Sequence, residues 1–69
     1  MKNQVCVILR GIDGDEEITM SRGATVRDVA TQKYHLFDRK IRLYRDGVSQ
    51  GNISWSTPVQ NGDIVCVIA

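Results

Sequence analysis

The chain has 69 residues, which is enough for one small domain spanning 1–69 and too short for two. Its 42% hydrophobic and 25% charged residues are typical of a folded globular domain and argue against disorder. The formal net charge of +1 gives no global field that would draw the protein to nucleic acid or to an anionic membrane. The apolar run Val5–Leu9 is too short to span a bilayer or to serve as a signal-peptide core, so we expect a cytoplasmic protein with no membrane partner.

A hairpin is predicted at the start of the chain. The β-forming run Val5–Leu9 favours a central strand, and Gly11 with Asp13-Gly14 marks a tight turn, because glycine tolerates positive φ. The segment Ile18–Ser21 alternates apolar and polar residues, as expected of a half-buried return strand. We interpret the four acids near this turn as a charged edge that resists aggregation, and not as a metal site. These acids are Asp13, Asp15, Glu16 and Glu17.

One helix is predicted after the hairpin. Thr25 is placed to cap it, since its side-chain oxygen can accept a backbone N–H, and Asp28 completes a capping-box spacing. An apolar stripe at helical spacing runs to Tyr34, and we expect the helix to end near His35. A helix of this length can cover only one face of a small sheet.

The second half of the chain predicts the remaining strands. Ile41–Tyr44 favours a third strand that Asp46-Gly47 stops, and the turn-forming residues from 48 to 61 leave room for one short strand. Ile64–Ile68 is a last strand that, like the first, is apolar throughout, which is typical of central strands. The sequence therefore predicts an α+β fold of the β-grasp type. In this fold a mixed four- to five-stranded sheet, with the two terminal strands at its centre, is crossed by one helix.

Three short motifs resemble those of ubiquitin-like proteins. Gly23–Val29 resembles their G-x-T-V-x-D-L helix start, Arg42–Gly47 resembles the ubiquitin segment Arg-Leu-Ile-Phe-Ala-Gly, and Val59–Val65 resembles an L-x-D-G-D-x-V ending. That ending is shared by sulfur carriers of thiamine and molybdopterin synthesis, by TGS domains, and by the small ubiquitin-like proteins of Gram-positive type VII secretion. The resemblance spans essentially the whole chain and implies the β-grasp fold.

One departure from this pattern concerns the C-terminal tail. Ubiquitin and the sulfur carriers end in a flexible Gly-Gly, whose terminal carboxylate is adenylated and then conjugated or thiolated. This sequence ends in Val67-Ile68-Ala69, so it resembles better the type VII secretion proteins and TGS domains, which lack such a tail. We therefore expect no conjugation. A longer natural chain ending in Gly-Gly would revive the alternative, which is a sulfur carrier or protein modifier.

No catalytic site, cofactor or metal is expected. The single histidine, His35, is predicted near a helix end, away from Cys6 and Cys66 on the central strands, so a nucleophilic cysteine–histidine pair is not expected. Two cysteines are too few for a zinc site, and no glycine-rich phosphate loop is present in the sequence. We interpret both cysteines as packing residues, because a disulfide directly across neighbouring strands is geometrically awkward.

Strand parity predicts a partner-binding surface, because alternate residues of a strand point to opposite faces of its sheet. The residues expected on the helix-free face are Ile8, Tyr44, Cys66 and Ile68, with Arg42 at the margin. Ubiquitin uses the equivalent face, where Tyr44 replaces its key isoleucine, and an aromatic anchor beside arginine is favoured at interface hot spots. The simpler alternatives are that central strands favour valine and isoleucine on both faces, or that Trp55 folds over this face.

A basic edge is the second candidate surface. Arg39, Lys40 and Arg45 crowd the third strand, together with Arg42. Such an edge would bind RNA in a TGS-like module, attract acidic proteins, or block edge-to-edge aggregation. We favour a non-catalytic ubiquitin-like protein-binding module or accessory subunit, monomeric or a weak homodimer. Nucleic acid is the less favoured partner.

Overall fold

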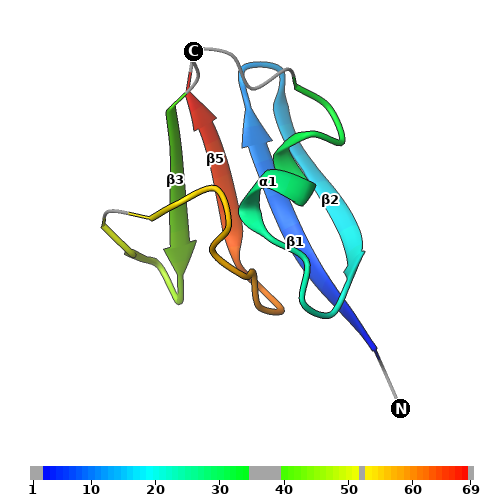
Figure 1. Ribbon diagram of the computed structural model, residues 1–69. Helices are drawn as coiled ribbons and strands as arrows, with labels where there is room; N and C mark the ends of the chain where they lie inside the picture. The colour runs from blue at the N-terminus through cyan, green and yellow to red at the C-terminus, as the bar shows by residue number, and fades with distance from the viewer. Residues whose placement is uncertain (1–2, 35–39, 52, 69) are drawn as a thin grey trace.

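The computed structural model describes residues 3–34, 40–51 and 53–68. In these ranges the chain forms five β-strands and one short α-helix (Figure 1). In chain order the elements are β1 (Gln4–Gly11), β2 (Gly14–Ser21), α1 (Val26–Ala30), β3 (Lys40–Arg45), β4 (Val48–Ser49) and β5 (Ile64–Ile68).

The five strands form one mixed sheet in the order β2-β1-β5-β3-β4. The two terminal strands, β1 and β5, run parallel to each other at its centre, and each has an antiparallel neighbour on its other side. This central position agrees with the one predicted from the apolar sequences of both strands, and each has a hydrogen-bonded neighbour on either side. The prediction of an α+β fold of the β-grasp type is confirmed.

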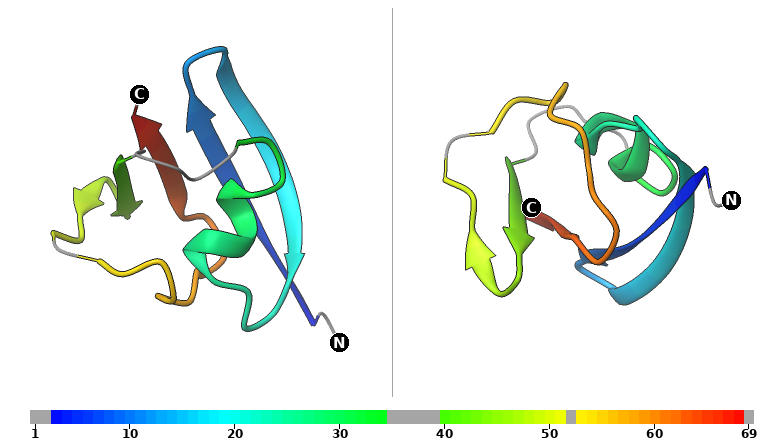
Figure 2. Two further views of the ribbon diagram at one scale, coloured as in Figure 1. Left: turned by 45° about the horizontal axis from the view of Figure 1, so that its top comes forward. Right: turned by 90° about the horizontal axis from the view of Figure 1, so that it is seen from below.

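Helix α1 lies against one face of the sheet only, above β1 and β5 (Figure 2). The core between the helix and the sheet is built from alternate strand residues, exemplified by Leu9, Leu43 and Val65. From the helix side, Val26 and Val29 complete this core, and both are fully buried. The opposite parity of each strand therefore points to the face without a helix.

The predicted capping box at the start of α1 is present. The Thr25 backbone N–H donates to the Asp28 carboxylate at 3.0 Å, and the Asp28 N–H donates to the Thr25 hydroxyl at 3.3 Å. The helix ends at Ala30 and not near His35, which lies outside the described residues. Beyond Ala30 the chain continues as a turn, because the N–H groups of residues 32 and 33 bond carbonyls three residues back instead of four.

Pairing with β1 makes β2 longer than its residue types predict. The alternating segment starts at Ile18, but the strand starts at Gly14, because Asp15 and Glu17 face Arg10 and Ile8 of β1 in register. Tertiary pairing here overrides the low strand preference of acidic residues. After β3, Asp46 and Gly47 both have positive φ, as a two-residue hairpin turn requires, so this predicted turn is confirmed.

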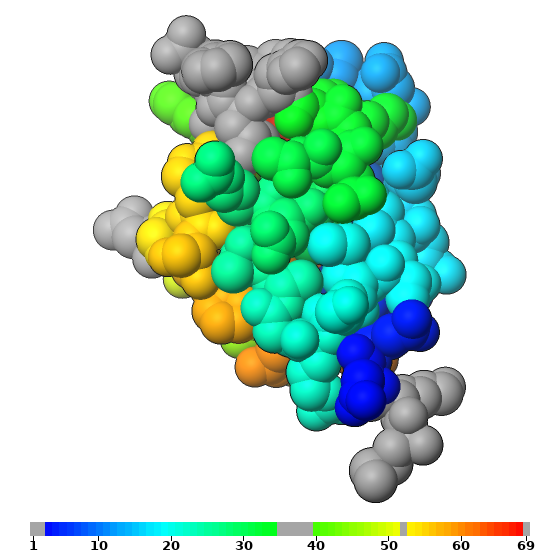
Figure 3. All heavy atoms as spheres, turned by 45° about the vertical axis from the view of Figure 1, so that its right-hand side comes forward, coloured from blue at the N-terminus to red at the C-terminus, as the bar shows by residue number. Residues whose placement is uncertain are grey.

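The segment from 53 to 59 runs beside α1 and closes one end of the core. Trp55 is partly buried against that core, and its carbonyl accepts the Arg27 N–H at 3.0 Å. Figure 3 shows this yellow-to-orange segment next to the green helix on the same side of the molecule. The idea that Trp55 folds over the helix-free face is therefore wrong, and its interpretation as a core-closing residue is confirmed.

Candidate functional site: the helix-free face of the sheet

The residues predicted for docking lie together on the open face, which we define as the side of the sheet away from α1. Strand register places Ile8 beside Ile64, and Ile64 beside Tyr44, in one row across β1, β5 and β3. Each of these side chains is partly buried by its neighbours and partly exposed. The row brings an aromatic ring next to two branched aliphatic side chains.

Two further rows lie toward the C-terminal end of β5. Cys66 lies between Arg10 of β1 and Arg42 of β3, and Ile68 lies beside Lys40 of β3. Arg42 is exposed, as predicted for a residue at the margin. We refer to the apolar residues of the three rows as the apolar strip, which consists of Ile8, Ile64, Tyr44, Cys66 and Ile68.

The β2 side of the apolar strip is acidic. Glu17 is the cross-strand neighbour of Ile8, and Asp15 is that of Arg10. Arg10 donates to both Asp15 oxygens, from Nε at 3.0 Å and from Nη2 at 3.1 Å. This hydrogen bonding raises the pKa of Arg10 and lowers that of Asp15. Sequence reasoning missed the pair, although a tight turn at residues 12 and 13 is enough to place position 10 opposite position 15.

The β3 side of the apolar strip is basic. Lys40 and Arg42 are both exposed, and neither forms an ion pair with any residue that the structure describes. Three strand spacings separate β2 from β3, or about 14 Å. The open face thus carries acid, apolar and basic residues in that order across its width.

Two large hydrophobic residues are well exposed away from the strip. Ile12, in the turn between β1 and β2, is 62% exposed and lies at the same end of the sheet as Ile68. Val48 of β4 is also 62% exposed. Sequence reasoning did not single out either residue, although an isoleucine inside a polar turn is a usable signal for Ile12.

The two cysteines share the open face but do not meet. In the parallel pairing of β1 with β5, Cys66 lies beside Arg10, which is four residues beyond Cys6. Four strand residues span about 13 Å, whereas the Cα atoms of a disulfide lie within about 7 Å. Both thiols are free, and a bridge between them within one chain is excluded. Loss of contact with water raises the pKa of Cys6, and the hydrogen bond and charge of Glu17 raise it further.

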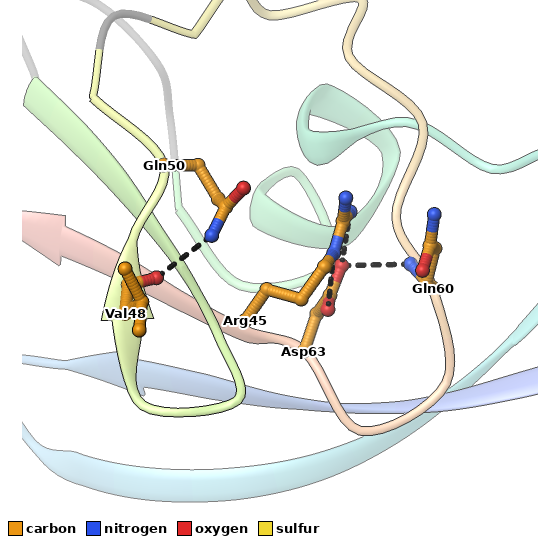
Figure 4. Close-up of polar contacts among 5 residues, drawn as sticks. All are labelled: Arg45, Val48, Gln50, Gln60 and Asp63. Carbon is orange, nitrogen blue, oxygen red and sulfur yellow. Dashed lines mark hydrogen bonds and ion pairs between the residues drawn. The ribbon is translucent and has the colours of Figure 1, made fainter.

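The structure corrects the predicted basic edge at Arg45. This side chain has the parity of the helix side, and it donates to the Asp63 carboxylate from Nε at 3.0 Å and from Nη2 at 2.8 Å (Figure 4). Hydrogen bonding to Asp63 raises the pKa of Arg45. Because this ion pair occupies the guanidinium, and Arg39 lies outside the described residues, only Lys40 of the predicted trio is described as exposed.

The same carboxylate explains the Gly-Asp motif near the end of the chain. Asp63 is only 1% exposed, and its Oδ2 also accepts the Gln60 N–H at 2.8 Å. Gly62 has a φ of 89° and donates its N–H to the Cys6 carbonyl at 2.7 Å. The turn before β5 is thus fixed to both β3 and β1, which sets the register of the open face.

Among residues 3–34, 40–51 and 53–68, no three His, Cys, Asp or Glu side chains are grouped closely enough to hold a metal ion. Within the same ranges, no helix has the length and apolar character needed to cross a bilayer.

Comparisons with known proteins support the fold. No family model matches the chain, and no curated protein matches it either. A solved structure described as "Molecular Mimicry of SUMO promotes DNA repair" is similar with a TM-score of 0.55 and 20% sequence identity, covering 100% of this chain and 95% of that one. At this level of identity the likeness concerns the fold alone, and the fold of this chain is the ubiquitin-like β-grasp.

Proposed function

We propose that this ubiquitin-like module is non-catalytic and acts as an adaptor or accessory subunit by binding a protein through its open face. The observation that carries the proposal is the apolar strip with Tyr44 at one end and the exposed Arg42 beside it. Tyrosine and arginine are enriched at interface hot spots, where truncation of one side chain costs about 2 kcal/mol or more. A partner that covers the strip would complete the burial that the sheet leaves partial.

The position of the other segments supports this assignment. Three residues from described segments outside the sheet, Ala24, Ile53 and Val59, join the core on the α1 side. None of them supplies a cover for the apolar strip. A face that stays partly exposed, on central strands whose other face is buried in the core, is an available docking surface.

The test is a pull-down from native extract with the wild type and Tyr44→Asp as baits. We expect the substitution to abolish partner recovery, because it places a charge within the buried interface. Val48→Asp is the matched control, since it adds the same charge at an exposed apolar residue outside the strip. Equal recovery of the same partners by wild type and Tyr44→Asp would overturn the proposal.

RNA binding is less well supported than protein binding. Lys40 and Arg42 remain exposed on β3, but the acids Asp15 and Glu17 lie on the same face and would repel a polyanion.

A further inference from the structure

The turn before β5 contains the pair Asn61-Gly62, which can react with itself. The Gly62 amide nitrogen can attack the side-chain carbonyl carbon of Asn61, because glycine has no Cβ atom to hinder the approach. This is the single asparagine–glycine pair in the sequence. Both residues are exposed, so water and hydroxide reach them and burial does not protect them.

The reaction is a deamidation that consumes water and releases ammonia. Base removes the Gly62 N–H proton, the nitrogen forms a bond to Cγ of Asn61, and the side-chain nitrogen Nδ2 takes up a proton and leaves as ammonia. Water then opens the resulting five-membered succinimide ring at one of its two carbonyl carbons. Opening at Cγ gives aspartate. Opening at the main-chain carbon gives isoaspartate, in which the main chain runs through the former side chain.

In the folded chain, both reacting groups are bonded to the main chain of Cys6. The Gly62 N–H donates to the Cys6 carbonyl at 2.7 Å, and the Cys6 N–H donates to Asn61 Oδ1 at 2.8 Å. Solvent base removes a hydrogen-bonded amide proton only after its bond has opened. The proton that must leave first is therefore held by β1, and the side chain that must turn toward Gly62 is held there as well.

We propose that Asn61 is a deamidation site that the fold keeps closed for as long as the turn stays bonded to β1. This inference goes beyond the proposed function and does not depend on it. The rate of the reaction measures how often the turn separates from β1, and each event leaves a permanent change in the chain.

The two products differ in their effect on the turn. Aspartate at position 61 leaves the main chain unchanged, and its carboxylate can still accept the Cys6 N–H. Isoaspartate adds one methylene to the main chain, inside a turn that the Asp63 N–H closes by donating to the Gln60 carbonyl at 3.0 Å. The longer turn no longer fits both this bond and the bond between Gly62 and Cys6. Isoaspartate should therefore release the turn from β1.

The turn between β3 and β4 supplies a matched control. Asp46→Asn creates a second asparagine–glycine pair there, with Gly47 as its second residue. Asparagine tolerates the positive φ of position 46 as aspartate does. Both positions are exposed, but no residue that the structure describes accepts a hydrogen bond from the Gly47 N–H. The two pairs in this variant thus differ in whether the glycine N–H is bonded.

The test follows deamidation of the full chain of Asp46→Asn by peptide mapping and mass spectrometry, in buffer and in concentrated urea at one pH and temperature. In buffer, Asn61 should react on the order of 100-fold more slowly than in urea, because opening a bonded turn is an uphill step. The introduced pair should react at similar rates in both conditions. Hydrogen exchange of the Gly62 amide in the wild type should be slowed by the same factor as the deamidation of Asn61, since both begin with loss of that proton.

Three results would overturn the closed site. Asn61 reacts equally fast in buffer and in urea, or the introduced pair is slowed in buffer as much as Asn61, which would make turn geometry the cause. In the third, the Gly62 amide is protected from exchange while Asn61 still deamidates at its unfolded rate. The first and third comparisons need only the wild type, so they stand even if Asp46→Asn fails to fold.

The effect of isoaspartate is tested on the separated product. The isoaspartate form should lose exchange protection at the amides of Cys6 and Ile8, which the turn binds through Asn61 Oδ1 and the Asp63 carbonyl, and should unfold at a lower urea concentration. Asn61→Asp has the new charge without the added methylene and should keep both properties. An isoaspartate form with wild-type exchange at both amides would contradict the release of the turn.

Discussion

The two faces of the central strands carry the same kinds of residue but have different surroundings. On one face, Leu9 and Val65 are sealed under α1 and are essentially inaccessible to water. On the other, Ile8 and Ile64 alternate with them along the same strands and remain partly exposed. Residue type alone therefore does not decide burial in a β-grasp sheet. The single helix decides it, because it can cover only one face, and the face left over is available for a partner.

Neighbouring residues on β1 give the largest expected contrast in stability. Leu9→Ala should lower the free energy of unfolding by about 3 kcal/mol, because it opens a cavity in a sealed core. Ile8→Ala should lower it clearly less, since Ile8 already contacts water in the folded state. Urea denaturation of both variants makes the comparison, and equal losses would contradict the difference between the faces.

The two bidentate ion pairs extend the comparison to charged groups. Asp63→Ala should lower the free energy of unfolding by about 2–3 kcal/mol, because it leaves Arg45 and the Gln60 N–H without their buried acceptor. Asp15→Ala removes the corresponding acceptor from Arg10 on the open face, where water can replace the lost carboxylate. The decrease in the free energy of unfolding should therefore be near the limit of detection. A loss for Asp15→Ala as large as that for Asp63→Ala would contradict this account.

Close packing at the end of β1 predicts an intermediate effect. A Cβ atom added at Gly11 would lie 1.8 Å from the Tyr34 hydroxyl and 2.5 Å from ring atom Cζ, so the whole ring must shift. We expect Gly11→Ala to lower the free energy of unfolding by about 1–2 kcal/mol. Thermal unfolding of Gly11→Ala in a Tyr34→Leu background should show a smaller cost, since the ring is then absent. An unchanged cost would place the strain elsewhere.

The smallest expected effect is a change in thiol reactivity on the open face. The raised pKa of Cys6 means that less thiolate is present at a given pH, so alkylation at pH 8 should be slower than for an ordinary cysteine. Glu17→Gln removes the nearby negative charge and should shift the pH–rate profile to lower pH. Both rates are measured in a Cys66→Ala background, so that only one thiol reacts. A profile that does not move would exclude Glu17 as a cause of the raised pKa.

Local signals in the sequence were sufficient for much of the fold. The capping box at Thr25, the turn at Asp46-Gly47 and the unbroken apolar run Ile64–Ile68 each act within a few residues, and each lies where it was predicted. The extent of β2 could not be predicted in this way, because its first half is held by pairing with β1 and not by its own residue preferences.

The site was less predictable, because its features depend on register between distant segments. Strand parity alone was enough to predict that the residues of the apolar strip face away from the helix. The separation of Cys6 from Cys66 depends on the stagger of two parallel strands joined through the rest of the chain. Strand parity alone places Arg45 on the helix side and Arg42 on the open face. The pairing of Arg45 with Asp63 nevertheless joins residues 18 positions apart, and nothing near Arg45 in the sequence identifies Asp63 as its partner.

The most direct test of the central claim measures stability and binding on one variant, Tyr44→Asp. If the open face serves a partner and not the core, this variant should unfold within about 1 kcal/mol of the wild type while partner recovery is lost, as befits a surface substitution. If the variant instead loses as much stability as Leu9→Ala, or unfolds like the wild type and still binds its partner, the division between a sealed face and a docking face is wrong.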